Sequence, residues 1–301
     1  MAPAPRDESK TDLNELKAVP SWTFMIPAPM YKRVVILAVL GLAFIAALLV
    51  TIFGGVFGRR HPSPSELLGR KGFSWRTEET AHLLVHYEAV SFAEKELRWL
   101  TSEHELAMPR VLELLGEQSY PDKIHIFAVE SRVRLKALTD NDGPEAFPKH
   151  NTVTCVFSEG DKTIGGHEIM HVISINRWGQ WKSDRVWLSE GLAVYANDEW
   201  HGHNLHALNK HLRDTKQLVS LDRLLANMRS YPAPIGYPES GSFVKFLHEH
   251  YGREKLKELW QAGRADFHQI YGRSLTELEA EWREVIDSSD ASGLEYSSVS
   301  H

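Results

Sequence analysis

The sequence contains a single cysteine, Cys155, among its 301 residues. One cysteine excludes an internal disulfide framework and a cysteine-rich zinc ribbon, and it leaves the redox compartment open. The chain also lacks a surplus of positive charge, because its 34 Lys and Arg residues are outnumbered by 40 Asp and Glu residues. Since the two signs are interspersed, the sequence has no basic surface of the kind that binds nucleic acid.

Charge is missing altogether from residues 34–57, VVILAVLGLAFIAALLVTIFGGVF. As a helix this segment would be about 36 Å long, enough to cross a bilayer. A cleaved signal peptide is the competing interpretation, but the run is longer than the usual apolar region and starts late. It also has no small-x-small cleavage site before its polar flank. We therefore predict a single transmembrane anchor over residues 32–58, in preference to a signal peptide or a buried core helix.

The flanks of this anchor do not decide its orientation, because five Lys or Arg residues precede the apolar run and five follow it within 20 residues. Long domains translocate largely regardless of their charges, so we expect the large C-terminal part outside the cytoplasm. The proline-rich residues 1–31 are expected to be a disordered tail, and residues 59–78 a linker that leaves the membrane. The remaining chain, 79–287, is long enough for one substantial folded domain.

The motif HEIMH at residues 167–171 is the clearest chemical signal in that domain. On a helix, His167 and His171 lie four residues apart on one face, where both imidazoles can reach one metal ion. Glu168 points to the side, as suits a residue that contacts the attacking water rather than the ion. The alternative for this short motif in a histidine-rich chain is a solvated helix face.

A hydrolytic zinc site needs a third protein ligand and an open fourth position. The metzincin pattern is excluded, because Ser174 and Arg177 stand where it requires glycine and histidine. Asp184 lies in a polar turn. Glu190, within WLSEG, follows His171 after 18 residues, a span that allows one helix to end and a second to return antiparallel. The sequence therefore favours Glu190 as the third ligand.

HEIMH followed by WLSEGLAVY resembles the gluzincin zinc metallopeptidases, and most closely their peptidase MA-like group. The resemblance implies one zinc ion per chain bound by His167, His171 and Glu190. It also implies that Glu168 is the general base that takes a proton from a zinc-activated water. It covers residues 80–287 loosely and residues 164–200 with specificity. The protein is thus expected to be a membrane-anchored zinc metallopeptidase that acts on a peptide or protein.

Two departures from related patterns limit what this resemblance implies. No GxMEN-type segment is present, so aminopeptidase specificity is unsupported and an endopeptidase is favoured. Val194 occupies the position where thermolysin has an aspartate in its glutamate helix. The hydrogen-bond partner of the zinc histidines must therefore come from elsewhere, and Asn197 and Asp198 are weak candidates.

The developing oxyanion also needs a hydrogen-bond donor, which gluzincins often take from a downstream Tyr, His or Arg. The candidate is Tyr237, which we expect at the end of the loop SYPAPIGY, before a helix beginning near Glu239. Its segment YPESGSF is similar to the family's arrangement of a tyrosine, small residues and an aromatic residue. The alternative role is an ordinary loop aromatic that packs on the next helix.

The hydropathy pattern predicts strands at 82–88, 123–129 and 152–158, and a helix at about 89–116. In the third strand, Val153, Cys155 and Phe157 share the expected buried face. The resemblance implies that this strand forms the sheet edge on which a peptide lies, although a simple core or edge strand without a ligand fits equally well. The fold class is therefore α+β, a gluzincin-type domain with a small mixed sheet and C-terminal helices, preceded by one transmembrane helix.

Downstream, 239–252 has the stripe of a packed helix, and Ser274 to Glu277 form a capping box that opens another. Residues 288–301 are expected to be a disordered tail. Two further groups of histidines are treated as surface or packing residues rather than a second metal site. They are the stretch with His201, His203, His206 and His211, and the pair His248 and His250.

A non-catalytic domain that keeps the zinc fold for binding or assembly is the rival interpretation. Glu168 argues against it, because a pure binding module needs no base between its ligands. Hydrolysis of a non-peptide amide is a third interpretation, since a fold and a site do not determine the substrate. The sequence leaves the substrate, cleavage preference, partners, regulation and oligomeric state open.

The predicted orientation can be tested with an epitope tag fused to the C-terminus. If the catalytic domain lies outside the cytoplasm, protease added to intact cells removes the tag, because no membrane separates the two. A cytoplasmic marker that survives the treatment is the control for cell integrity. A tag that stays protected until the cells are lysed would contradict the prediction.

Overall fold

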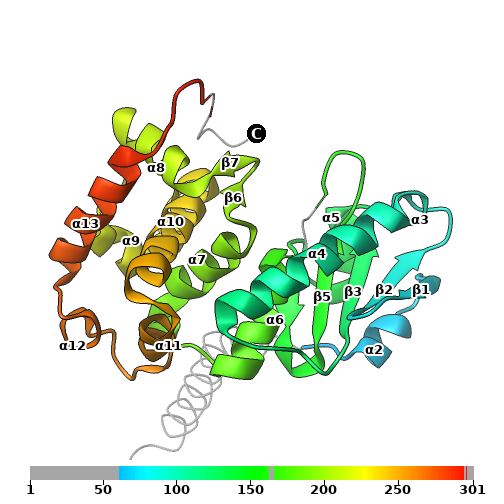
Figure 1. The fold of residues 1–301 in the computed structure, drawn as a ribbon. Helices are drawn as coiled ribbons and strands as arrows, with labels where there is room; N and C mark the ends of the chain where they lie inside the picture. Colours follow the sequence, from blue (N-terminus) through cyan, green and yellow to red (C-terminus); the bar gives the residue numbers. More distant parts are fainter. Residues whose placement is uncertain (1–60, 163–165, 295, 297–301) are drawn as a thin grey trace, which may run out of the picture. The chain divides into compact units, whose positions relative to one another are not determined.

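The structure, a computed structural model, describes residues 61–162, 166–294 and 296. The predicted tail at 1–31 and the predicted anchor at 32–58 lie outside these residues. Within the described residues, no helix is both long and apolar enough to cross a membrane. The described part folds as one unit that begins at His61, and its α+β composition agrees with the expected class (Figure 1).

A five-stranded mixed sheet forms the N-terminal half of this unit. Strands β2, β3 and β5 run parallel, while β1 and β4 pair antiparallel at the two edges, in the order β1-β2-β3-β5-β4. Their bounds are Trp75–Glu79 (β1), Leu83–Glu88 (β2), Ile124–Val129 (β3), Glu145–Phe147 (β4) and Thr152–Val156 (β5). The three predicted strands are thus present, as β2, β3 and β5.

Helices cover both faces of the sheet (Figure 1). Residues such as Val85, Ile126 and Val153 pack on one side with the helices α4, Leu97–Leu115, and α6, Gly166–Trp178. On the other side, Phe127, Val129 and Val156 pack with α2, Pro64–Leu68, and α5, Arg132–Thr139. Both faces are therefore covered, and the central strands are largely buried on both sides, including the polar side chains of His86, Thr152 and Thr154.

The structure differs from the sequence-based expectations at several boundaries. Helix α2 and strand β1 lie inside the expected linker at 59–78, so ordered structure begins before residue 79. The predicted helix at 89–116 is two helices, α3, Phe92–Lys95, and α4, which meet at Glu96. Gly116 ends α4 in the left-handed conformation, at φ 73°, as its position predicts.

The expected sheet edge was placed on the wrong strand. Residues 152–156 form β5, which lies between β3 and β4 and is buried along its whole length. The edge on this side of the sheet is β4, and β5 runs back along it after the connection at Pro148–His150, a short 3-10 helix, η1. Cys155 is buried as expected, and burial raises the pKa of its thiol to about 12.

The chain after α6 is mainly helical and forms the second half of the unit (Figure 1). Its helices are α7, Val186–Asn197; α8, Leu205–Asp214; α9, Leu221–Asn227; α10, Ala233–Tyr251; α11, Arg253–Gln261; α12, Phe267–Tyr271; and α13, Leu275–Ser288. Two 3-10 helices, η2 at Ser183–Arg185 and η3 at Met228–Ser230, precede α7 and α10. The two-stranded pair β6, Glu199–Trp200, and β7, His203–Asn204, follows α7.

Helix α10 begins six residues earlier than predicted, so Tyr237 lies inside a helix and not at the end of a loop. Pro238 lies inside this helix, where it lacks the N–H for one helical hydrogen bond. The carbonyl four residues earlier, that of Pro234, accepts a hydrogen bond from the Tyr296 hydroxyl at 2.7 Å instead. Helix α13 has the predicted Ser274–Glu277 capping box and extends to Ser288, the first residue of the expected tail.

Helices α7 and α10 approach closely at two glycines. A Cβ atom on Gly191 of α7 would lie 2.6 Å from the Ser240 backbone oxygen of α10 and 2.7 Å from Val244 Cγ2. Gly241 of α10 in turn faces Val194, whose Cγ1 would lie 2.6 Å from an added Cβ. The contact therefore requires glycine on both helices and fixes the position of α7.

Gly191→Ala is expected to destabilise the protein by about 1–3 kcal/mol, because the new methyl group has to push α10 away. Denaturant unfolding of the purified full chain measures this change. Gly263→Ala is the matched control, since a Cβ on Gly263 meets no atom within 4 Å. Equal stability of the Gly191→Ala variant and the parent would contradict the close helix contact.

Candidate metal centre

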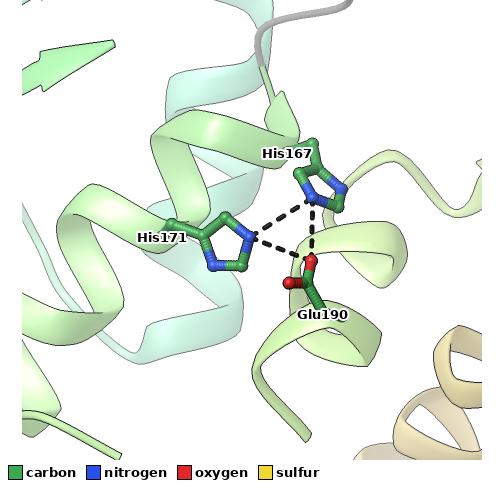
Figure 2. A group of neighbouring side chains, drawn as sticks. All are labelled: His167, His171 and Glu190. Atoms are coloured by element: carbon green, nitrogen blue, oxygen red, sulfur yellow. Dashed lines mark hydrogen bonds and ion pairs between the residues drawn. The ribbon is translucent and has the colours of Figure 1, made fainter. Parts of the chain in front are cut away.

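Helix α6 brings the two histidines of HEIMH together. The Nε2 atoms of His167 and His171 lie 3.2 Å apart, and their rings meet edge to face with centroids separated by 4.9 Å. The Nε2 atoms of both rings point to the same side of the helix (Figure 2). The predicted i, i+4 geometry on one helix face is present.

Glu190 reaches the same point from α7, which packs against α6. Its Oε2 atom lies 3.3 Å from His167 Nε2 and 3.3 Å from His171 Nε2 (Figure 2). The next residue on α7 is Gly191, the glycine that contacts α10. The contact between α7 and α10 therefore also sets where Glu190 lies.

The donor set fits zinc. Tetrahedral Zn²⁺ with nitrogen and oxygen ligands at about 2.0–2.1 Å separates neighbouring ligand atoms by roughly 3.3 Å. The three separations here, 3.2, 3.3 and 3.3 Å, agree with that value. All three ligand atoms lie within 4.8 Å of one another, so the cluster can hold a metal ion.

The electrostatics of Glu190 favour a carboxylate. Burial opposes its ionisation, but hydrogen bonding and charge attraction from His167 and His171 outweigh burial and lower its pKa. A glutamate must be ionised to bind a metal ion, so this lowered pKa suits Glu190 to that role.

Glu168 stands between the two histidines in the sequence, and its side chain is buried. Burial is the largest influence on it, and the nearby carboxylates of Glu190 and Glu145 add to burial against the attraction of His167. Together they raise the pKa of Glu168 to about 7. A carboxyl group with such a pKa can both accept and donate a proton near neutral pH.

Tyr237 lies beside this cluster, although on a helix rather than a loop. Its ring centroid is 6.3 Å from that of His167, and its other side stacks on Trp200 at 5.4 Å. Burial, followed by repulsion from Glu190, raises the pKa of Tyr237 to about 12. The phenol therefore keeps its proton and can donate it in a hydrogen bond.

Ser189 contacts His171, and the sequence had not pointed to this residue. Its Oγ atom lies 3.2 Å from His171 Nδ1, the nitrogen that faces away from the cluster. When Nε2 binds a metal, Nδ1 carries the proton and donates it to this hydroxyl. Neither earlier candidate takes this position, since Asn197 packs on Gly166 and Asp198 accepts a hydrogen bond from Lys245 at 2.7 Å. The signal was available, because Ser189 directly precedes Glu190 in WLSEG.

Arg229 of η3 was also missed. Its Nη2 atom donates to Glu190 Oε1 at 3.2 Å, so each oxygen of this carboxylate has its own partner. Arg229 is 39 residues from Glu190 and belongs to no local motif, so only the fold brings the two together.

The other histidines do not form a second cluster of this kind within the described residues. His206 is buried, and its Nδ1 atom lies 2.8 Å from the Ser242 hydroxyl, which also accepts a hydrogen bond from Trp282. His248 packs edge to face with Tyr195. His206 thus has a packing role, as the sequence allowed, whereas the part-buried His248 differs from the solvated helix face expected for this group.

The comparison with known families now bears on this site. A family model described as the Peptidase MA superfamily matches residues 121–288, more than half of the chain. The chain belongs to the Peptidase MA superfamily. The match spans β3 to α13 and includes both HEIMH and WLSEG, so membership in the Peptidase MA superfamily indicates a metallopeptidase-type domain. No curated protein matches the chain significantly.

Ser189→Ala is expected to weaken zinc binding about tenfold, because His171 loses the hydrogen bond that orients its ring. Competition with a chromophoric chelator measures the affinity. Ser174→Ala is the matched control, since the Ser174 hydroxyl lies 3.5 Å from the His171 carbonyl oxygen and does not contact the ring. Unchanged zinc affinity in the Ser189→Ala variant would show that this hydroxyl does not support the histidine.

Proposed function

We propose that this protein is a membrane-anchored, zinc-dependent peptidase that cleaves within peptide chains. One observation carries the proposal. His167, His171 and Glu190 converge at the spacing of a tetrahedral zinc site, and Glu168, which stands between the two histidines in the sequence, is buried. The anchor is the apolar segment 34–57, which the sequence alone supports.

Zinc, when bound, supplies the Lewis acidity that makes water nucleophilic near neutral pH and polarises a carbonyl group. Glu168 would take one proton from the attacking water on its carboxylate oxygen. It would then donate that proton to the leaving amine nitrogen as the peptide bond breaks. Burial, which disfavours the carboxylate, makes Glu168 a better proton acceptor than an exposed glutamate.

Tyr237 would donate a hydrogen bond to the carbonyl oxygen of the scissile bond as negative charge develops there. Its place beside His167 supports this role, and so does its stacking on Trp200, which restricts the ring. The raised pKa keeps the phenol protonated at neutral pH.

The substrate backbone would add to β4, the edge strand of the sheet, which immediately precedes β5. Glu145 of β4 is close enough to Glu168 to influence its pKa, so this edge lies near the proposed base. A peptide bound along an edge strand extends past the site on both sides, which favours cleavage inside a chain.

A non-catalytic domain of the same fold, acting in binding or assembly, is the alternative. Glu168 favours catalysis. A carboxyl group outside the three-ligand cluster adds nothing to coordination, and its burial costs stability unless the group has a use.

Glu168→Gln separates the two functions. We expect the purified full chain and this variant each to bind about one zinc ion, because the three ligands are unchanged. Peptide hydrolysis should fall by about 10²–10⁴-fold in the variant, as a general base is lost. The measurements are metal content and cleavage of a quenched fluorescent peptide library.

Glu159→Gln is the control, since Glu159 is an exposed glutamate eight residues before His167. It should keep both zinc and activity. Zinc in both parent and Glu168→Gln, with no hydrolysis of any peptide by the parent, would favour the binding domain. Absence of zinc from the parent would contradict both functions.

A further inference from the structure

Arg229 makes a contact that metal binding does not require. Its guanidinium donates to Glu190 Oε1, while Glu190 Oε2 faces the two histidines. The two oxygens therefore have separate tasks. Zinc at the cluster would be held through Oε2, and Arg229 could stay beside it without competing for the same atom.

Arg229 is also open to solvent, because 64% of its side chain is exposed whereas the Glu190 side chain is 12% exposed. Glu190 is its one ion-pair partner among the described residues. An arginine has five N–H donors in a planar fork, so donors remain on the exposed side of this guanidinium. They lie at the boundary between the metal cluster and solvent.

The segment that carries Arg229 is held firmly. Met228, its neighbour in η3, is buried, and the Met228 backbone oxygen would lie 3.1 Å from a Cβ on Gly236 of α10. The first turns of α10 also carry Tyr237, the proposed oxyanion donor. Arg229 and Tyr237 thus come from adjoining, packed segments, and the charge of Arg229 acts on Tyr237.

The charge balance shows what this arginine would attract. Glu190 and an ionised Glu168 would together balance the two positive charges of a zinc ion, so the cluster does not need a further cation for neutrality. Arg229 adds a positive charge on a solvent-exposed side chain that contacts this cluster. Such a surplus favours an anionic group on whatever molecule enters.

We infer that Arg229 recognises a carboxylate group of the substrate close to the scissile bond. The inference rests on the proposed peptidase function and narrows its substrate class to peptides with a carboxylate at that position. Guanidinium and carboxylate match in shape and can form two parallel hydrogen bonds. The carboxylate can belong to an acidic side chain or to the C-terminus of the peptide.

The test measures peptide binding by the full chain in detergent, saturated with zinc, in the Glu168→Gln background so that no peptide is consumed. Three peptide pools are titrated by calorimetry. The first has one fixed glutamate and an amidated C-terminus, the second has glutamine there and a free C-terminus, and the third has glutamine and an amide. The first two pools distinguish the two sources of carboxylate.

We expect at least one carboxylate pool to bind about tenfold more tightly than the neutral pool. Arg229→Ala should reduce this preference to about twofold or less, and Arg229→Lys should keep part of it as a point charge without the fork. Arg223→Ala is the matched control, because Arg223 is an exposed arginine on the adjoining α9. This variant should keep the full preference.

Equal binding of the three pools by the parent, or a preference that persists in Arg229→Ala, would overturn the inference. Binding of no pool would overturn it as well. Metal content and thermal unfolding of each variant show whether zinc or the fold was lost. If Arg229→Ala has lost either, the preference is read from Arg229→Lys, and a full preference in that variant would overturn the inference.

Cleavage of the same pools by the chain with Glu168 intact separates this inference from the proposed function. Cleavage without dependence on Arg229 leaves the peptidase and removes the carboxylate site. An Arg229-dependent preference without cleavage leaves the carboxylate site and removes the peptidase.

Discussion

The close contact between α7 and α10 is the constraint on which the site depends. Gly191 allows the backbone of α7 to lie against Ser240, and Glu190, one residue earlier, is thereby directed toward α6. The same helix α10 carries Tyr237 and supports the segment with Arg229. One helix contact therefore positions the proposed third metal ligand, the proposed oxyanion donor and the exposed arginine.

The site also shows how burial and charge divide roles among similar groups. Glu168 and Glu190 are both buried, and they lie close enough for their charges to interact. Their pKa values nevertheless move in opposite directions. Two histidines donate to Glu190 and keep it ionised, as coordination requires. Glu168 is affected mainly by burial, and its pKa rises into the range useful for proton transfer.

Local sequence predicted the features that depend on local geometry. The i, i+4 spacing of His167 and His171 determines their common helix face, and the alternating strands at 83–88 and 124–129 follow from hydropathy. Local sequence did not predict features that depend on contacts between residues far apart in the chain. The helix expected to begin near Glu239 begins at Ala233, and the Pro234 carbonyl, which Pro238 leaves without a helical donor, accepts a hydrogen bond from Tyr296. The edge strand was also misplaced, because pairing with β4 is a property of the sheet.

By itself, the sequence determined the two histidines, the glutamate between them, the candidate third ligand and the membership that the family comparison shows. These follow from spacing along one helix and from motifs a few residues long. Only the tertiary structure decided that Ser189 supports His171, that Tyr237 lies on a helix beside His167, and that Arg229 reaches Glu190. The physical reason is that such contacts join separate helices, whose relative positions are set by core packing rather than by local chain geometry.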